Sequence, residues 1–168
     1  MSLASSADSR IDPGLLGVRA TDSGDWELAA EWAKELGVAL IDKRPQDSGV
    51  VLLAGHPAAL ELINPTHTPK PVVIDFTQPQ CRQRLSSIAM RRDPLVKAIG
   101  LHRQRDLTVI DATAGLGHDG LSLAWLGAQV KWLESSPTLA LVLRQAITIA
   151  RSSDAQHLCA TAHRLSLT

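Results

Sequence analysis

Three glycines and one carboxylate carry the chemistry that this sequence suggests. Gly115, Gly117 and Gly120 form a G-x-G-x-x-G pattern a few residues after the apolar run of residues 107–110. Such a pattern lets the backbone turn sharply and brings a ligand close to the N-terminus of a helix. Glu134 follows 19 residues after Gly115, at the end of the next apolar run, where a carboxylate can accept both hydroxyls of a ribose. The spacing therefore predicts a site for a ligand that contains adenosine.

Asp111 distinguishes between ligands of this kind. It ends the first apolar run, and three residues separate it from the first glycine, whereas in dinucleotide sites that glycine follows the strand directly. A carboxylate here repels a pyrophosphate but attracts the ammonium group of a methionine moiety, and a sulfonium also favours an acidic pocket. The loop therefore favours S-adenosyl-L-methionine over NAD. The alternative role for Asp111 is to cap its own loop by accepting backbone N–H groups.

The elements that position these residues are expected to alternate between strands and helices. In chain order they are a strand at 107–110, a helix at 119–126, a strand at 129–133, a helix at 137–151 and a third strand at 158–162. This alternation is typical of a parallel sheet covered by helices. We therefore expect residues 106–168 to form the first half of a doubly wound α/β domain.

The rest of the chain predicts a smaller α+β lobe and a basic connection. The lobe is expected at 14–81, after a flexible lead at 1–13, with a helix at 22–37 and strands at 38–41, 50–53 and 72–76. The connection, at 82–105, is predicted to be helical in two pieces. Its second helix begins at Pro94, is capped by Asp93 and ends at Gly100.

Charge and composition limit the function classes. Basic and acidic residues number 17 each, so no global basic field is available to attract nucleic acid. The charge is nevertheless uneven: residues 1–76 carry a net −5, residues 77–105 a net +6 and residues 106–168 a net −1. The middle segment can therefore meet a polyanion.

Two cysteines and six histidines lack metal-site spacing, and no apolar run reaches the ~20 residues of a membrane span. We expect a cytoplasmic protein with reduced thiols, no metal and no membrane contact.

The glycine loop resembles that of the ribosomal RNA small subunit methyltransferase J family, which methylates the exocyclic N2 of a guanine in 16S rRNA. Val109-Ile-Asp-Ala-Thr-Ala-Gly-Leu-Gly-His-Asp119 is similar to the family's V-D-A-T-A-G-L-G-R-D loop, and Val73-Ile74-Asp75-Phe76 is similar to its V-D-F strand. The match to the loop continues through Glu134 to Pro137, and the similarity as a whole covers residues 50–160.

The resemblance implies a Rossmann-like class I S-adenosyl-L-methionine methyltransferase sheet, preceded by the small α+β lobe. It implies 16S rRNA or the small ribosomal subunit as the partner. Together with the loop pattern, it gives these cofactor-binding candidates: Asp111, Gly115, Gly117, His118, Asp119, Glu134 and Ser135. Together with the basic segment, it gives these RNA-binding candidates: Arg84, Arg91, Arg92 and Lys97. His118 and Ser135 stand where the family carries arginines.

No catalytic residue is assigned. In the family a later strand ends in an Asp-Pro-Met-Phe-Pro motif that holds the guanine amine, and the 168 residues do not contain it. We therefore expect a piece of the enzyme, or a chain that kept the cofactor loop without the chemistry. Two further readings stay open. One is a non-catalytic S-adenosyl-L-methionine or nucleotide-binding module. The other is an NAD-binding oxidoreductase fragment, which only the glycine pattern supports.

Overall fold

The computed structural model describes residue 12 and residues 14–88, 92–104 and 106–168. This chain divides into two compact units. The first comprises Met1–Val73 with Ser136–Thr138, and the second comprises Ile74–Ser135 with Leu139–Thr168. The boundaries expected from the sequence, at 14–81, 82–105 and 106–168, stay a prediction. The basic helices of the expected connection lie within the second unit.

The first unit is built on a mixed four-stranded sheet. Strand β1 pairs with β2 in parallel, and the pairs β2–β3 and β3–β4 are antiparallel. Along the chain the elements are β1 Leu15–Ala20, the short 3₁₀ turn η1 Ser23–Asp25, α1 Trp26–Leu36, β2 Gly49–Ala54, β3 Ala59–Ile63 and β4 Val72–Val73. The expected small α+β lobe is therefore present.

Helix α1 ends where the sequence predicts it, at Gly37, which adopts a left-handed conformation with φ of 67°. Its start is later than expected because a 3₁₀ turn precedes it, and the carboxylate of Asp22 caps that turn by accepting the Gly24 N–H at 2.7 Å. The apolar stripe of this helix, which includes Trp26 and Trp32, predicts that both tryptophans lie in the core. Trp32 is 6% exposed, but Trp26 is 46% exposed, so that expectation is wrong for the first turn.

Two of the strands in this unit were not anticipated, and one expected strand is absent. Strands β1 and β3 were missed, whereas β2 lies where residues 50–53 predicted it. Within residues 38–41, Leu40 forms a single bridge with Val18 and no named strand develops. Of the expected strand at 72–76, only the first two residues pair. The physical reason is Asp75, whose carboxylate accepts the Thr77 N–H at 2.9 Å and turns the chain away from the sheet.

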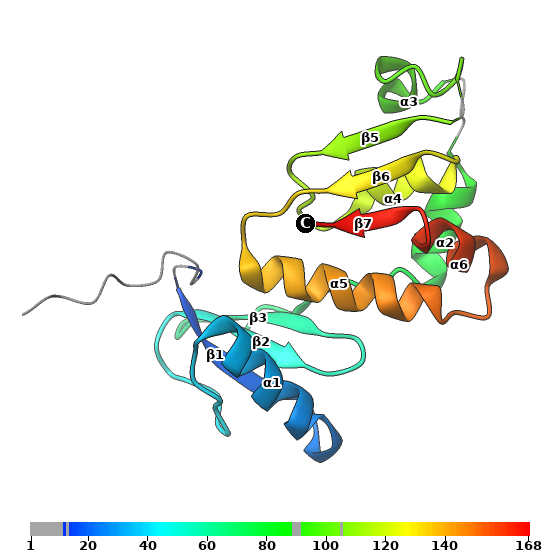
Figure 1. The fold of residues 1–168 in the computed structure, drawn as a ribbon. Coiled ribbons are helices and arrows are strands. Elements are labelled where there is room, and N and C mark those ends of the chain that lie inside the picture. The colour runs from blue at the N-terminus through cyan, green and yellow to red at the C-terminus, as the bar shows by residue number, and fades with distance from the viewer. Residues whose placement is uncertain (1–11, 13, 89–91, 105) are drawn as a thin grey trace, which may run out of the picture. The chain divides into compact units, whose positions relative to one another are not determined.

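The second unit holds a parallel three-stranded sheet in the order β5–β6–β7 (Figure 1). Its elements are α2 Pro79–Ser86, α3 Pro94–Ala98, β5 Thr108–Asp111, α4 His118–Trp125, β6 Gln129–Trp132, α5 Pro137–Arg151, α6 Gln156–Ala162 and β7 Leu165–Leu167. Helix α4 packs against β6 and α6. This confirms the α/β class, and the three arrowheads at one end of the sheet in Figure 1 mark the edge where the strands end.

The sequence predicted most of these elements but mistook one helix for a strand. Residues 158–162 form the larger part of α6, and the third strand comes later, as β7. A short apolar run does not distinguish the two structures by itself. The buried residues Leu158, Thr161 and Ala162 are spaced three and one apart, which is the pattern of one helix face. Asp93 caps α3 as expected, because its carboxylate accepts the Val96 N–H at 3.1 Å.

Candidate functional site

The glycine loop lies at the carboxyl edge of the parallel sheet, between β5 and α4. Asp111 and Trp132 are paired at the ends of β5 and β6, and the pairing continues as Leu133 N–H donates to the Asp111 carbonyl at 2.9 Å. Ala114 N–H then donates to the Leu133 carbonyl at 3.2 Å. The loop therefore stays attached to the strand that follows it, and its conformation is fixed by the sheet.

Gly115 and Glu134 meet in this loop. Gly115 has a φ of 54°, and its N–H donates to Oε2 of Glu134 at 3.1 Å. A Cβ placed on Gly115 would meet only the Thr113 carbonyl, at 3.7 Å. One face of Gly115 is thus open, while the carboxylate predicted from the 19-residue spacing lies directly beside it. The structure thus brings these two candidates together at the carboxyl edge of the sheet, and their role toward a ligand stays a prediction.

The other two glycines of the pattern face the core. A Cβ on Gly117 would approach Trp132 Cη2 to 2.9 Å, and a Cβ on Gly120 would overlap the Trp132 indole nitrogen and lie 2.8 Å from Cε2. Trp132 is fully buried, and its Nε1 has no hydrogen-bond partner among the described residues. Phe76 lies under the same loop, with its ring centroid 6.1 Å from that of Trp132. Gly117 and Gly120 are therefore needed for packing of α4 on β6.

Asp111 forms the contact that its alternative role predicts. Its Oδ1 accepts the Thr113 N–H at 3.2 Å, which closes a small turn at the end of β5. The side chain is nevertheless half-buried at the sheet edge, next to the loop that contains Gly115. Capping one N–H occupies one of its two oxygens. The two roles considered for Asp111 are therefore compatible with each other.

His118 and Asp119 begin helix α4, and both are exposed, as is Ser135 beyond β6. Partial burial of the imidazole lowers the pKa of His118 below its ordinary value, and the positive charge of Arg84 lowers it further. The carboxylate of Asp119 acts in the opposite direction, and its effect is the smallest of the three. Arg84 of α2 therefore lies close enough to His118, at the start of α4, to affect the protonation of its imidazole.

We expect His118 to titrate below the ordinary histidine pKa of about 6.5, and Arg84→Gln to raise its midpoint because a neighbouring cation is lost. Since the folded-state pKa is lowered, protonation of His118 opposes folding, and stability should fall as the pH drops below about 6.5. NMR titration of the His118 ring measures the midpoint. Arg82→Gln, on the same helix, is the matched control. An equal change in both variants would show that Arg84 has no specific effect.

A pocket of about 250 Å³ joins α2, α3 and α4 within the second unit. Its polar lining residues are Arg84, Asp93, Asp119 and Ser122. The structure thus brings together one residue predicted for RNA binding, Arg84, and one predicted for cofactor binding, Asp119. The other RNA-binding candidates are not in this lining: Arg92 and Lys97 are exposed elsewhere, and Arg91 lies outside the described residues.

Sequence reasoning missed the aromatic support under the loop. Neither Phe76 nor Trp132 was assigned a role, although both are buried against the glycine pattern. A usable signal was present, because a glycine three residues into a helix pairs naturally with a large side chain on the following strand.

Among the residues described, no His, Cys, Asp and Glu form a group that could hold a metal ion. No helix in that part of the chain is long and apolar enough to cross a membrane.

Known proteins share both the sequence and the fold. A family model described as a putative SAM-dependent methyltransferase matches residues 33–168. The ribosomal RNA small subunit methyltransferase J of Halorhodospira halophila is 51% identical over 152 residues, covering 89% of this chain and 55% of that protein. The same-named protein of Thioalkalivibrio sulfidiphilus is 36% identical over 138 residues, covering 82% and 54%. The chain spans about half the length of these curated relatives.

A solved structure gives the same picture of the fold. The crystal structure of a SAM-dependent methyltransferase from Neisseria gonorrhoeae aligns with a TM-score of 0.64 at 25% sequence identity. The alignment covers 90% of this chain and 57% of that one. The class I Rossmann-like fold implied by the family resemblance is therefore confirmed.

Proposed function

This chain belongs to the putative SAM-dependent methyltransferase family, and from that membership we propose that it is the cofactor-binding part of an enzyme that methylates the N2 of a guanine in 16S rRNA. The proposed substrate, 16S rRNA, rests on the similarity to the ribosomal RNA small subunit methyltransferases. The cofactor of the family is S-adenosyl-L-methionine, which supplies an electrophilic methyl group on a sulfonium.

One observation supports the cofactor site above all others, and it is the contact between Gly115 N–H and Glu134 Oε2 at 3.1 Å. It places a carboxylate at the end of β6, beside an open glycine at the end of β5. We propose that Glu134 accepts the hydroxyl groups of the ribose and that Gly115 allows close approach of the ligand to the backbone. The remaining candidates, Gly117, His118, Asp119 and Ser135, follow from the family resemblance.

Asp111 is proposed to hold the ammonium group at the methionine end of the cofactor. Its carboxylate lies at the sheet edge, and capping of Thr113 leaves Oδ2 for a ligand. The negative charge of Asp111 would repel the pyrophosphate of NAD and attract an ammonium group. The acidic edge therefore supports S-adenosyl-L-methionine as the ligand rather than a dinucleotide.

The RNA is proposed to meet the basic segment that leads into the cofactor loop. Residues 77–105 carry a net charge of +6, and Arg84, Arg92 and Lys97 are exposed in this segment. Exposed cations of this kind bind phosphates and orient a nucleic acid without reading its sequence. With the guanine amine in line with the sulfonium methyl, transfer would depend mainly on positioning.

The proposal is tested by calorimetric titration of the 168-residue chain with S-adenosylhomocysteine, with NAD as the comparison ligand. We expect selective binding of S-adenosylhomocysteine. Binding of NAD alone would favour the oxidoreductase reading. Absence of binding to either ligand, in a sample shown to be folded by circular dichroism, would contradict the assignment of the glycine loop.

Asp111→Asn separates the two roles of this side chain in the same titration. The amide oxygen still accepts the Thr113 N–H, so the turn is kept, but the charge that would attract the ammonium group is lost. We expect binding of S-adenosylhomocysteine to weaken about tenfold, on the scale of a charge-assisted hydrogen bond. Asp106→Asn is the control, because Asp106 is an exposed carboxylate that precedes β5. Unchanged affinity in Asp111→Asn would reduce Asp111 to a loop cap.

A further inference from the structure

The first unit contains a larger pocket that the cofactor site does not use. It has a volume of about 480 Å³ and lies where the loop of residues 44–46 meets the end of β3 at Ile63 and the residues 64–68 that follow it. This volume is in the range of sites that enclose a small molecule. Its polar lining residues are Arg44, Gln46, Asn64, Thr66, His67 and Thr68, and its remaining lining is Ile63 and two prolines. The lining therefore offers many hydrogen-bond donors, one fixed positive charge and no carboxylate.

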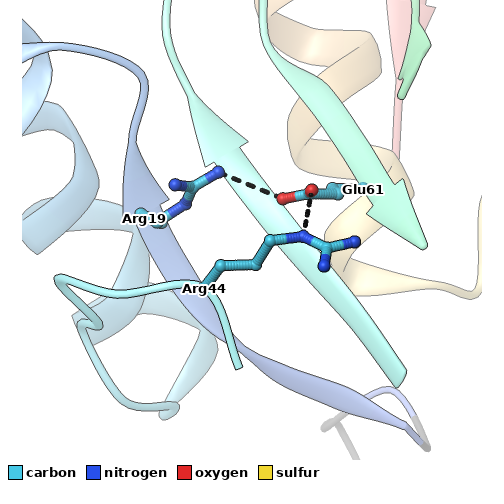
Figure 2. Close-up of polar contacts among 3 residues, drawn as sticks. All are labelled: Arg19, Arg44 and Glu61. Atoms are coloured by element: carbon cyan, nitrogen blue, oxygen red, sulfur yellow. Dashed lines mark hydrogen bonds and ion pairs between the residues drawn. The ribbon is translucent and has the colours of Figure 1, made fainter. Parts of the chain in front are cut away.

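Arg44 is held in place by a buried carboxylate. Glu61 on β3 is 7% exposed, and its two oxygens are shared between two arginines. Arg44 Nε donates to Oε1 at 2.8 Å, and the terminal nitrogen Nη2 of Arg19 donates to Oε2 at 3.1 Å (Figure 2). The three side chains together carry a net positive charge. Because Glu61 is buried between these donors, the orientation of the Arg44 guanidinium is fixed in advance.

The terminal nitrogens of Arg44 are left for a ligand. Figure 2 shows them on the side of the guanidinium that faces away from Glu61. Within the part of the chain that the structure describes, the bonded nitrogen of this side chain is Nε, and no residue binds the other two. A guanidinium fixed through Nε presents its other N–H groups as a fork, which matches the oxygens of a phosphate.

The opposite wall of the pocket is ordered by its own hydrogen bonds. Asn64 Oδ1 accepts the Thr66 N–H at 2.9 Å and the Thr66 hydroxyl at 2.7 Å. The Thr66 hydroxyl is also 3.3 Å from Nδ1 of His67. Because the Asn64 oxygen already has these partners, its amide NH₂ is the group that can face a ligand. The wall therefore adds donors to the charge of Arg44.

We propose that this pocket binds a phosphate group, and that the group is a phosphodiester of the RNA. Phosphate binding is inferred from the lining described above. That the phosphate belongs to RNA rests on the proposed function. The unit as a whole is acidic, since residues 1–73 carry six basic and ten acidic side chains, a net −4, and residues 136–138 add no charge. Such a surface does not attract a long polyanion, so one local phosphate contact is expected rather than a continuous track.

RNA binding by Arg44→Gln tests the pocket directly. Fluorescence anisotropy with a labelled single-stranded RNA is measured over a series of salt concentrations, without cofactor. We expect affinity to fall about tenfold and the slope of log K against log salt to shrink by about 0.7, the value for one phosphate of a single strand. Lys43→Gln is the matched control. Lys43 is the exposed neighbour of Arg44, its substitution also removes one positive charge, and it does not line the pocket. Equal losses in the two variants would overturn the proposal.

A second measurement needs no variant and separates the sources of the phosphate. Amide NMR spectra of the 168-residue chain are recorded with inorganic phosphate and then with the RNA. We expect the amides of Asn64, Thr66, His67 and Thr68 to shift with both ligands, and RNA to displace phosphate. No shift with phosphate would overturn the pocket, and a shift with phosphate that RNA cannot displace would overturn the RNA assignment. Failure of the proposed function is a separate result, because it is read from S-adenosylhomocysteine binding in the other unit.

Discussion

Replacement of Gly120 by alanine is expected to lower the free energy of unfolding of the second unit by about 2–3 kcal/mol. The alanine Cβ would overlap the indole nitrogen of Trp132, which is fully buried and cannot move toward solvent. In an unconstrained helix the same substitution would stabilise the protein by up to about 1 kcal/mol. The expected sign is thus opposite to that given by helix propensity, and chemical denaturation followed by circular dichroism measures it.

The double variant Gly120→Ala/Trp132→Leu identifies the cause. If the overlap with the indole is responsible, alanine at 120 should cost much less when residue 132 is leucine, with a coupling of about 1–3 kcal/mol. Ser122→Ala, in the same helix, controls for substitution in α4. An equal cost of Gly120→Ala in both backgrounds would show that the tryptophan is not the obstacle.

Glu134→Ala is expected to have the largest effect on ligand binding. The carboxylate is proposed to accept the ribose hydroxyls and also accepts the Gly115 N–H at 3.1 Å. Its loss should weaken binding of S-adenosylhomocysteine by about 1–3 kcal/mol, which is roughly 5- to 150-fold in Kd. Isothermal titration calorimetry measures the change, and thermal unfolding of the free protein reports whether the loop has been damaged.

Glu134→Gln separates ribose binding from support of the loop. The glutamine oxygen can still accept the Gly115 N–H, but the side chain no longer offers two acceptors to a pair of hydroxyl groups. We therefore expect Glu134→Gln to keep the thermal stability of the parent and to bind S-adenosylhomocysteine nearly as weakly as Glu134→Ala. Full recovery of affinity would mean that Glu134 acts only through the loop.

The sequence predicted the parts of this fold that depend on local signals. Helix α5 has the predicted bounds because Pro137 starts it, and the pairing of Gly115 with Glu134 follows from their spacing across one helix. The packing of Gly120 on Trp132 could not be predicted in the same way. It depends on which residues of α4 and β6 face each other, and the sequence does not state this.

The errors arose where tertiary contacts overrule a local pattern. Leu158–Ala162 is short and apolar, and only the burial of one face distinguishes the helix from a strand. The effect of Arg84 on His118 was missed for a related reason, because it depends on how α2 packs beside α4; the assignment of Arg84 to RNA, made from the family resemblance and the basic segment, stays a prediction. The roles of Asp111, His118 and Glu134 toward a cofactor, and those of the basic residues toward RNA, stay predictions.

Burial of the Glu61 carboxylate also affects the order in which Glu61, Arg19 and Arg44 can be substituted without loss of stability. The side chain of Glu61 is 9% exposed, whereas those of Arg19 and Arg44 are 29% and 37% exposed. Water can solvate either arginine if its partner disappears, but it cannot solvate the buried anion. A lineage that replaces Glu61 first can therefore lose the arginines later at little cost. A lineage that loses both arginines first is expected to pass through a destabilised variant, because the buried carboxylate is left without a cation. The expected order of substitution is thus directional, with Glu61, the most buried of the three, changing before the two arginines.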